Sequence, residues 1–494
     1  MAKHWLSKSR FIKSIQCQKA LYLGKHHPEL KDEISEDQQA LFSQGTSVGE
    51  LATQLFPGGT DVTPESFYDF STSIAQTTEL LKQDSVVIYE AAFEFEGVLC
   101  ALDILVKKDG VIKAYEVKSS TEVKSVYLQD AGLQYYVMKA CGYEPENISI
   151  VHINNEYVRN GEVDIFELFT IASIKEEVVD FQSEIPTLLQ TAKATLEGAD
   201  IPTIDIGPHC SSPYGCDFEG HCWEHIPDYS IFNISRLTSE KKFDLYYDGI
   251  LDFKEIPKDY KLNDYQRLQV ESELSGNGQV DKVEIRKFLN SLTYPLQFLD
   301  FETFQSAVPL FDNSRPYQQL VFQYSLHIQE KPGSKLTHYE YLAEGNGTDP
   351  RKKLIEQLIK DSKGTGDILV YNIGFERGRL NELKEIYPAK SDDIQGIIDR
   401  LVDLMIPFQK KHYYAPDLKG SYSIKKVLPS LVPELSYSEL EISNGGMAMD
   451  IFKNMMQGTF NGDIESTRKA LLEYCGLDTY AMFKILEKLY EHTN

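Results

Sequence analysis

Two acidic residues flank a turn signal in the stretch ALDILVKKDGVIKAYEVKSS. Its Asp109-Gly110 dipeptide is favoured in two-residue β-hairpin turns, and both flanking runs are rich in β-forming residues. If these two residues form the turn, Asp103 lies opposite Glu116, and Lys118 points to the same face. Facing carboxylates destabilise a sheet unless something binds them, and Mg²⁺ or Mn²⁺ prefers oxygen ligands. The pattern predicts a metal site in which Lys118 orients water or steadies phosphoryl charge, with a solvent-facing acidic cluster as the alternative.

A second set of acids lies toward the C-terminus. Asp300 and Glu302 alternate in QFLDFETF, which places both on one face of the expected strand. Glu376 stands where the strand ILVYNIGFE runs into a helix. Tyr474 and Asp478 are four residues apart on an expected helix, and therefore one turn apart on one face. Each of these patterns is common by itself, so only their combination suggests chemistry.

Three cysteines, Cys210, Cys216 and Cys222, recur at a six-residue step in PHCSSPYGCDFEGHCW. Clustered cysteines in a reducing compartment more often indicate metal binding or catalysis than disulfides. Structural tetrahedral sites use four protein ligands, so a fourth is needed. Cys17 in FIKSIQCQKALYL, on an expected helix, is the candidate. A four-cysteine zinc site and unligated thiols remain the alternatives.

The elements that must position these residues fall into three stretches. Residues 1–225 combine a β-rich stretch near 87–118 with an amphipathic helix around 124–140, and are expected to form one α/β unit. Residues 226–290 read as short helical pieces that form a connector without visible chemistry. Residues 291–494 are expected to form a second α/β unit that opens on the strand YPLQFLDFET and closes on a long helix.

The composition of the 494 residues is that of an ordinary globular protein, with a formal net charge of -25. No apolar run has the length of a signal peptide or a membrane span, so we expect a cytoplasmic protein without a membrane partner. The negative charge restricts nucleic-acid binding to local patches, for which residues 1–28 and 410–426 are candidates, the latter with five Lys and three Tyr. Solvated charged faces are the alternative for both. Cys100 and Cys141 are expected to pack in the core.

The first acid set resembles the RecB-like branch of the PD-(D/E)XK nuclease superfamily, which has a restriction-endonuclease-like fold. The resemblance rests on Asp103, on EVK at Glu116 and Lys118, and on the following helix with DAGLQYYV. It implies that Gln134 of this helix lies beside the active site. It also implies that Glu50 of QGTSVGELA completes the metal shell.

The cysteine layout resembles the iron-staple subgroup of these nucleases, which includes CRISPR-associated exonucleases and helicase-nuclease subunits. In that subgroup one cysteine precedes the nuclease core and three follow it, and together they hold a 4Fe-4S cluster. The resemblance implies that Cys17, Cys210, Cys216 and Cys222 hold such a cluster, which pins the start of the chain to the end of the module. The tight C-x2-4-C pairs usual in zinc knuckles are absent from this sequence.

The second acid set resembles the DEDD exonucleases of the RNase H-like fold, in the subgroup with Tyr four residues before the last Asp. The resemblance implies that two metal ions, about 4 Å apart, activate a water and stabilise the departing 3′ oxygen. The implied ligands are Asp300, Glu302, Glu376 and Asp478, and Tyr474 positions the water. The second motif normally supplies Asp, so Glu376 departs from the pattern.

The pairing of the two modules resembles a bacterial protein family and covers nearly the whole chain except the connector. It implies a metal-dependent nuclease that acts on DNA ends or single-stranded DNA, with Mg²⁺ or Mn²⁺ and a 4Fe-4S cluster, in DNA repair, recombination or defence. The choice of DNA over RNA rests on the resemblance. A ribonuclease and a nucleic-acid-binding scaffold with decayed sites are the alternatives. Both acid sets are present apart from the change at Glu376, which argues against the scaffold.

Overall fold

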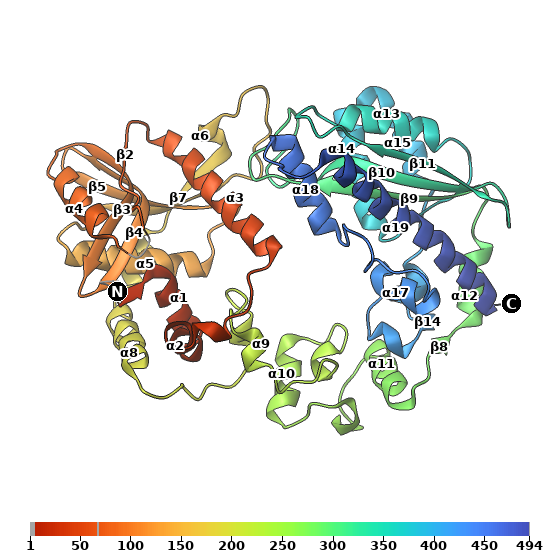
Figure 1. Ribbon diagram of the computed structural model, residues 1–494, viewed down its shortest axis with the longest axis horizontal. Helices are drawn as coiled ribbons and strands as arrows, with labels where there is room; N and C mark the ends of the chain where they lie inside the picture. Colours follow the sequence, from red (N-terminus) through yellow and green to blue (C-terminus); the bar gives the residue numbers. More distant parts are fainter. Residues whose placement is uncertain (1–4, 67–68, 494) are drawn as a thin grey trace. The chain divides into compact units, whose positions relative to one another are not determined.

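The chain folds into two compact units in a computed structural model that describes residues 5–66 and 69–493. Each unit combines a sheet with helices (Figure 1), so the predicted mixed α/β class is confirmed. Unit 1 consists of Met1–His225 and Ala307–Tyr317, and unit 2 of Ile226–Ser306 and Gln318–Asn494.

Unit 1 is built on a sheet of seven strands within the described residues, in the order β2-β3-β4-β5-β6-β7, with β1 beside β4. Neighbouring strands from β3 to β5 are antiparallel, whereas β5 and β6 are parallel. The strands are β1 (Leu6–Ser7), β2 (Thr60–Asp61), β3 (Val86–Phe95), β4 (Val98–Lys108), β5 (Val111–Lys118), β6 (Asn147–Ile153) and β7 (Phe169–Ser173).

The β4–β5 hairpin turns at Asp109 and Gly110, as the sequence predicts. Both residues have positive φ, 51° and 82°, which a tight two-residue turn between twisted strands requires. Lys108 pairs with Val111, and the same register continues along the two strands. The hairpin therefore brings the end of β5 back beside the middle of β4.

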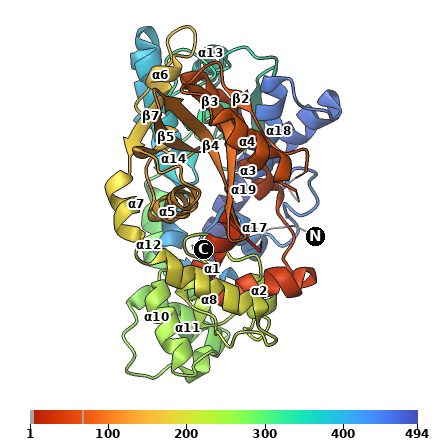
Figure 2. The ribbon, with the colours of Figure 1, turned by 90° about the vertical axis from the view of Figure 1, so that its left-hand side faces the viewer.

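Helices pack against both faces of this sheet (Figure 2). On one face α5 packs on β3 and β4 and also contacts α1 and α7, whereas α3 contacts β5. The helices of unit 1 are α1 (Lys8–Gln16), α2 (Gln18–His26), α3 (Glu36–Ala52), α4 (Ser71–Leu80), α5 (Ser125–Ala140), α6 (Ile165–Leu168), α7 (Lys175–Phe181), α8 (Ile185–Glu197) and α9 (Glu219–Cys222), with 3-10 turns η1 (Pro28–Leu30), η2 (Thr53–Leu55) and η3 (Pro208–Cys210).

The segment Ala307–Tyr317 belongs to unit 1 although the chain on either side of it belongs to unit 2. Ala307 packs in the apolar cluster that lies between α3 and the sheet, and the ring of Tyr317 contacts the same cluster. The Tyr317 hydroxyl donates to the carbonyl of Ser119 and accepts from the Gln44 side chain. The segment therefore closes part of the core of unit 1.

Arg159 holds the middle of this segment. Its guanidinium donates to the carbonyl oxygens of Pro309 and Leu310 at 2.9 and 2.8 Å, and its own carbonyl accepts from the backbone N–H of Asn313 at 2.9 Å. The Arg159 side chain thus satisfies the backbone carbonyls of Pro309 and Leu310, which do not belong to a β-strand.

Unit 2 is built on a five-stranded sheet, within the described residues, in the order β11-β10-β9-β12-β13. Strands β9, β10 and β11 are antiparallel neighbours, whereas β9, β12 and β13 are parallel. A separate two-stranded ladder joins β14 to β8. The strands are β8 (Gln279–Val280), β9 (Leu296–Phe304), β10 (Leu320–Gln329), β11 (Leu336–Leu342), β12 (Ile368–Val370), β13 (Leu401–Asp403) and β14 (Tyr413–Tyr414).

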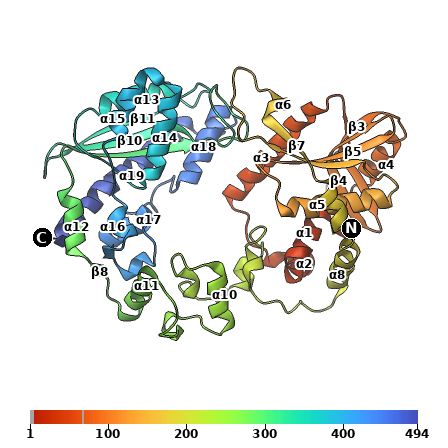
Figure 3. The same ribbon diagram turned by 180° about the vertical axis from the view of Figure 1, so that it is seen from behind.

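Helices cover both faces of the five-stranded sheet, with α13 and α15 on one side and α19 on the other (Figures 1 and 3). No helix in the described residues is long and apolar enough to cross a membrane. The helices of unit 2 are α10 (Ser239–Tyr247), α11 (Asp264–Ser275), α12 (Lys282–Asn290), α13 (Arg351–Asp361), α14 (Ile373–Ile386), α15 (Ser391–Ile398), α16 (Ile406–Gln409), α17 (Ile424–Leu431), α18 (Gly445–Gln457) and α19 (Ile464–Thr493), with 3-10 turns η4 (Ile231–Asn233), η5 (Phe253–Glu255), η6 (Pro388–Lys390) and η7 (Pro416–Leu418).

Strand alternation divides β9 between the two faces. Leu299 and Phe301 point into the core formed with α13, α14 and α15. Phe298 lies between them in sequence and instead contacts Phe483 of α19. Because successive side chains alternate, the even-numbered residues of β9 face α19.

The expected connector, residues 226–290, lies within unit 2 and has a small apolar core of its own. It consists mainly of short helices, as the sequence predicts, but it also supplies β8, which pairs with β14. The two-stranded ladder fixes the connector to the C-terminal part of the unit.

Arg159→Ala should loosen the segment Ala307–Tyr317, because the carbonyls that accept from Arg159 lose their donor. We expect the unfolding free energy of unit 1 to fall by roughly 1–3 kcal/mol, measured by urea denaturation. Amide hydrogen exchange should become faster in the segment. Lys352→Ala, on the exposed side of α13, is the control and should change stability by less than about 0.5 kcal/mol. Unchanged exchange in the segment would show that Arg159 does not anchor it.

Candidate functional site

The first group of polar residues, here called the hairpin cluster, surrounds Glu116 at the end of β5. Glu116 is only 1% exposed. Its Oε1 accepts from Lys118 Nζ at 2.7 Å and from Lys8 Nζ at 2.6 Å. Its Oε2 accepts from Gln134 Nε2 of α5 at 2.6 Å. The structure thus brings together three residues singled out from the sequence and adds Lys8, which local patterns did not indicate.

Asp130 of α5 is the second unexpected member of the hairpin cluster. Its Oδ2 accepts from Lys118 Nζ at 2.9 Å and lies 3.7 Å from Lys8 Nζ. Asp130 and Gln134 are one helical turn apart, so the same face of α5 presents both side chains to β5. The one sequence signal for Asp130 was its position, four residues before Gln134 on the expected helix.

Asp103 and Glu90 complete the carboxylates of the hairpin cluster. Asp103 Oδ2 accepts from the backbone N–H of Val117 at 2.5 Å. Glu90 lies opposite Asp103 on the neighbouring strand, because Tyr89 pairs with Ile104 and Ala91 with Leu102 on either side of them. Its backbone is left-handed, with φ 57°, an uncommon conformation for a residue with a side chain and one that is often found at functional sites.

The structure does not bring Glu50 into the hairpin cluster. Glu50 lies near the end of α3, which packs against β5, but its side chain is exposed. In the described part of the chain no recorded contact joins its carboxylate to Asp103 or Glu116. Glu90, which lies beside Asp103, is therefore the better candidate for an additional acid.

Charges within the hairpin cluster shift the pKa values of its members in opposite directions. Burial alone would raise the pKa of Glu116, but Lys118 and Lys8 outweigh it and hold this pKa below the usual range. Burial, together with the charge of Glu116, raises the pKa of Asp103 to about 6. Burial and the nearby Asp103 raise the pKa of Glu90 to about 8. Two ammonium groups therefore neutralise only part of the carboxylate charge.

The second group, here called the thiol cluster, comprises Cys17, Cys210, Cys216 and Cys222. All four are free thiols and line one cavity together with Phe218. Burial, with smaller contributions from the other three cysteines, raises the pKa of Cys216 to about 11, a sign of how near the four thiols lie. The structure thus gathers all four cysteines that the sequence proposes as ligands.

Cys17 does not lie within a helix, contrary to the expectation from the sequence. Its backbone is extended, with φ -162° and ψ 117°, and it ends α1 and begins α2. Two adjacent helices therefore meet at the residue, which turns its side chain toward the cavity that the other cysteines line. Cys100 is buried in the core as expected, and Cys141 is partly buried against that core.

Hydrogen bonds brace the start of the chain against the loop that carries the three later cysteines. Gln16 Nε2 donates to the carbonyl oxygens of His209 and Tyr214 at 2.9 and 2.7 Å. The backbone N–H of Asp32 donates to the carbonyl of Asp217 at 2.7 Å. The position of Cys17 relative to the later cysteines is therefore fixed on both sides of it.

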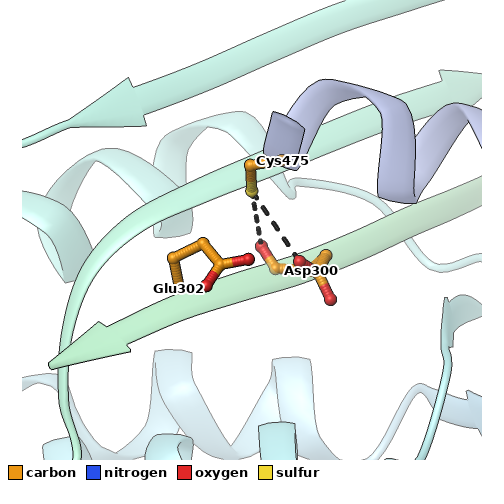
Figure 4. A group of neighbouring side chains, drawn as sticks. All are labelled: Asp300, Glu302 and Cys475. Carbon is orange, nitrogen blue, oxygen red and sulfur yellow. Dashed lines mark hydrogen bonds between the residues drawn. The ribbon is translucent and has the colours of Figure 1, made fainter. Parts of the chain in front are cut away.

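The third group, here called the acid cluster, comprises Asp300, Glu302, Glu376 and Asp478 of unit 2. Asp300 and Glu302 are on the face of β9 that is covered by α19, as strand alternation predicts. Figure 4 shows both carboxylates beside Cys475 of α19. The Cys475 thiol donates weakly to Asp300 Oδ2 at 3.8 Å. Three separate elements, β9, α14 and α19, thus supply the carboxylates.

Tyr437, which sequence patterns did not single out, and Lys425 of the basic stretch 410–426 lie around Asp478. The Tyr437 hydroxyl donates to Asp478 Oδ1 at 2.6 Å. Lys425 Nζ lies 5.5 Å from the ring centre of Tyr474 and 5.6 Å from that of Tyr437, within cation–π range. Lys425 is therefore a cation near the acid cluster, and Tyr474 lies beside Asp478 as the sequence predicts.

Glu376 lies in the first turn of α14 and is only 1% exposed. Its Oε2 has no hydrogen-bond partner among the described residues, which is costly for a buried carboxylate. Asp403 orients this helix start, because its carboxylate accepts from the backbone N–H groups of Asn372 and Ile373, both at 3.2 Å. The unpartnered oxygen makes Glu376 a candidate ligand.

Burial raises the pKa values of all four carboxylates in the acid cluster, and repulsion adds to it for Asp300 and Glu302 from within the cluster and for Glu376 from Asp403. Burial is the larger cause for Asp300, followed by the charges of Asp478, Glu302 and Glu376. Burial and Asp478 raise the pKa of Glu302 well above its usual range. Burial raises the pKa of Asp478 to about 6 and that of Glu376 to about 8. The cluster therefore favours protons or a cation near neutral pH.

The stretch 410–426 is partly buried and partly exposed: Lys410, Lys419 and Lys426 lie on the surface, so its role in nucleic-acid binding stays a prediction. Lys411, Tyr413 and Tyr414 are buried, so these two rings are not available to stack on bases. Residues 1–4 of the other basic stretch, 1–28, lie outside the described residues, and Lys8 of that stretch lies in the hairpin cluster. Local composition identified the charge but not the burial, which depends on tertiary packing.

Comparison with known proteins places part of this chain among uncharacterised relatives. Residues 297–423 match the family described as a domain of unknown function, DUF2779, and thus include β9 and Glu376 but not α19. An uncharacterized protein of Ureaplasma parvum is 32% identical over 170 residues, which is 30% of this chain and 24% of that protein. Uncharacterized proteins of Mycoplasma genitalium and Mycoplasma pneumoniae are 27% and 29% identical over 40% and 38% of this chain. The matches span only 32% and 31% of these two relatives, so each match covers less than a third of the relative's length.

Glu376→Gln should stabilise the metal-free protein at alkaline pH. Because the folded state raises this pKa from 4.5 to about 8, it binds more protons than the unfolded state, and stability is lost as pH rises through that range. Urea denaturation in EDTA should show the variant more stable by roughly 1–4 kcal/mol at pH 8 and similar at pH 4.5. Glu473→Gln, on the exposed side of α19, is the control. Equal stability at pH 8 would mean that Glu376 is not strained by its burial.

Proposed function

We propose that the protein is a metal-dependent nuclease with two sites, a RecB-like PD-(D/E)XK site at the hairpin cluster and a DEDD-type 3′-5′ exonuclease site at the acid cluster. Single-stranded DNA and DNA ends are the proposed substrates. The observation that carries the proposal is the convergence of four carboxylates from β9, α14 and α19, of which Glu302, Glu376 and Asp478 are buried and Asp300 is partly buried. One oxygen of Glu376 has no hydrogen-bond partner among the described residues. Buried like charges at this density indicate a bound cation.

In the hairpin cluster, Glu90, Asp103 and Glu116 supply carboxylate oxygens suited to a hard cation. A divalent cation bound there would polarise the scissile phosphate and lower the pKa of a water molecule. Lys118 already contacts Glu116 and is placed to hold a water or a phosphate oxygen nearby. Gln134 donates a hydrogen bond to the other oxygen of Glu116 and so fixes the orientation of the carboxylate.

In the acid cluster, the chain's own residues would orient an attacking water. Tyr474 lies beside Asp478, where its hydroxyl can accept or donate a hydrogen bond to that water. Tyr437 donates a hydrogen bond to Asp478 Oδ1 and so fixes the orientation of this carboxylate. Lys425 lies near enough to offset the negative charge of a phosphate group that enters the cluster.

The thiol cluster fits a polynuclear iron-sulfur group better than a single zinc ion. Thiolates around one tetrahedral zinc lie about 3.8 Å apart. In the described part of the chain, no three of the four thiol sulfurs lie within 4.8 Å of one another. The four thiols are therefore more widely spaced than the ligands of one zinc ion. A 4Fe-4S cluster held there would join α1 and α2 to the loop that ends the nuclease module.

The two-site proposal predicts separable activities. Lys118→Ala should lower cleavage at the hairpin cluster by about 10²-fold or more while metal-dependent 3′-5′ trimming persists, and Asp300→Ala should do the reverse. The measurement is the cleavage pattern of 5′-labelled and 3′-labelled single-stranded DNA in Mn²⁺, with labelled RNA in parallel.

Matched controls for this experiment lie in the same units. Lys113→Ala removes an exposed lysine from the same strand as Lys118, and Asp392→Ala removes an exposed acid from α15. Both controls should cleave like the wild type. The proposal fails if either active-site variant alone abolishes all cleavage while remaining folded, or if RNA alone is cut.

The proposed cluster predicts iron in the purified protein. Anaerobically purified protein should be brown and contain about four iron ions per chain. Cys17→Ser or Cys216→Ser should lose the colour and destabilise the N-terminal helices, because these thiols line the shared cavity. Cys141→Ser, outside the cavity, is the control and should keep its iron. Stoichiometric zinc without iron would contradict the proposal.

A further inference from the structure

A thiol lies within the acid cluster of unit 2, beyond the four carboxylates already described. Ligand atoms of Asp300, Glu302 and Cys475 all lie within 4.8 Å of one another, the one such group recorded in the described part of the chain. Figure 4 shows the Cys475 side chain pointing from α19 toward Asp300 on β9. Cys475 is fully buried, so the thiol has no contact with bulk water.

The separation between the sulfur and the nearest carboxylate oxygen suits two ligands of one ion. Cys475 Sγ lies 3.8 Å from Asp300 Oδ2. With Zn–S and Zn–O distances of about 2.3 and 2.1 Å, two ligands on a tetrahedral zinc ion lie about 3.6 Å apart. Only a small side-chain movement would therefore close the pair around a cation.

Glu376 provides a second, independent sign of a ligand at this place. Its Oε2 is buried without a hydrogen-bond partner among the described residues, and its charge acts on Asp300. A buried carboxylate oxygen without a donor is costly to the fold unless a cation binds it. Lys425 lowers the pKa of Glu302 but does not cancel the effects of burial and Asp478, so the thiol is accompanied by carboxylates whose charge is only partly balanced.

We propose that Cys475 is a sulfur ligand of this cluster, and that Asp300, Glu302 and Cys475 bind a thiophilic divalent cation of the zinc class in preference to Mg²⁺. The inference rests on the proposed function in that it assigns the metal class of the same site. Mg²⁺ is bound by oxygen ligands, whereas thiolate ligands select softer ions such as Zn²⁺ and Co²⁺. On binding, the S–H bond breaks, an S–metal bond forms and one proton passes to solvent, with no change in oxidation state.

Titration with Co²⁺ alone tests this inference, because a thiolate–Co²⁺ bond absorbs in the near ultraviolet and carboxylate ligands do not. The wild-type protein, with its other metal sites loaded, should gain this band at about one Co²⁺ per chain. Cys475→Ser should lose the band and bind Co²⁺ at least about tenfold more weakly, while Mg²⁺ affinity changes less than about twofold. Cys141→Ser, outside the cluster, should keep the band. A band that is unchanged in Cys475→Ser would overturn the inference.

A second variant keeps the test decisive if Cys475→Ser does not fold. Glu302→Gln retains Cys475 and the shape of the side chain but removes one carboxylate charge, so the affinity for Co²⁺ should fall about tenfold or more. Unchanged Co²⁺ affinity in this variant would overturn the inference. Nuclease assays on the same samples separate the two ideas. A Cys475-dependent band without nuclease activity supports the proposed metal class and refutes the proposed function. Nuclease activity without such a band supports the proposed function and refutes the metal class.

Discussion

Repulsion between buried carboxylates is the constraint on which both candidate sites depend. In unit 1 the chain supplies its own compensation, because Lys8 and Lys118 contact Glu116 directly. In unit 2 the compensation is weaker: Lys425 lies near the acid cluster, and Glu376 retains an oxygen without a partner among the described residues. Unit 1 can therefore hold its site in place without a metal ion, whereas unit 2 needs protons or a cation to relieve the same repulsion.

Local patterns were sufficient to predict the parts of the fold that depend on strand period and turn geometry. The Asp109-Gly110 turn sets the register of β4 against β5, and that register alone places Asp103 near Glu116. A two-residue alternation likewise places Asp300 and Glu302 on one face of β9. These predictions succeeded because each depends on residues that are neighbours in sequence or across a single tight turn.

The residues that the sequence did not reveal come together only through tertiary packing. Lys8 contacts Glu116 from 108 residues earlier in the chain, and Tyr437 contacts Asp478 from 41 residues earlier. No local periodicity carries information about such contacts. The same limit explains the corrections at Cys17 and Glu50, because the break at Cys17 and the exposure of Glu50 depend on what packs around them.

The segment Ala307–Tyr317 makes the chain cross between the units three times, after residues 225, 306 and 317. A single cut cannot separate the units. A fragment that ends at residue 225 would leave the apolar cluster beneath α3 without Ala307 and the ring of Tyr317. A fragment that starts at residue 226 would carry these side chains with nothing to bury them, and so would be prone to aggregate. The units are therefore interleaved in the sequence, and a fragment that represents unit 1 must carry residues 307–317 together with residues 1–225.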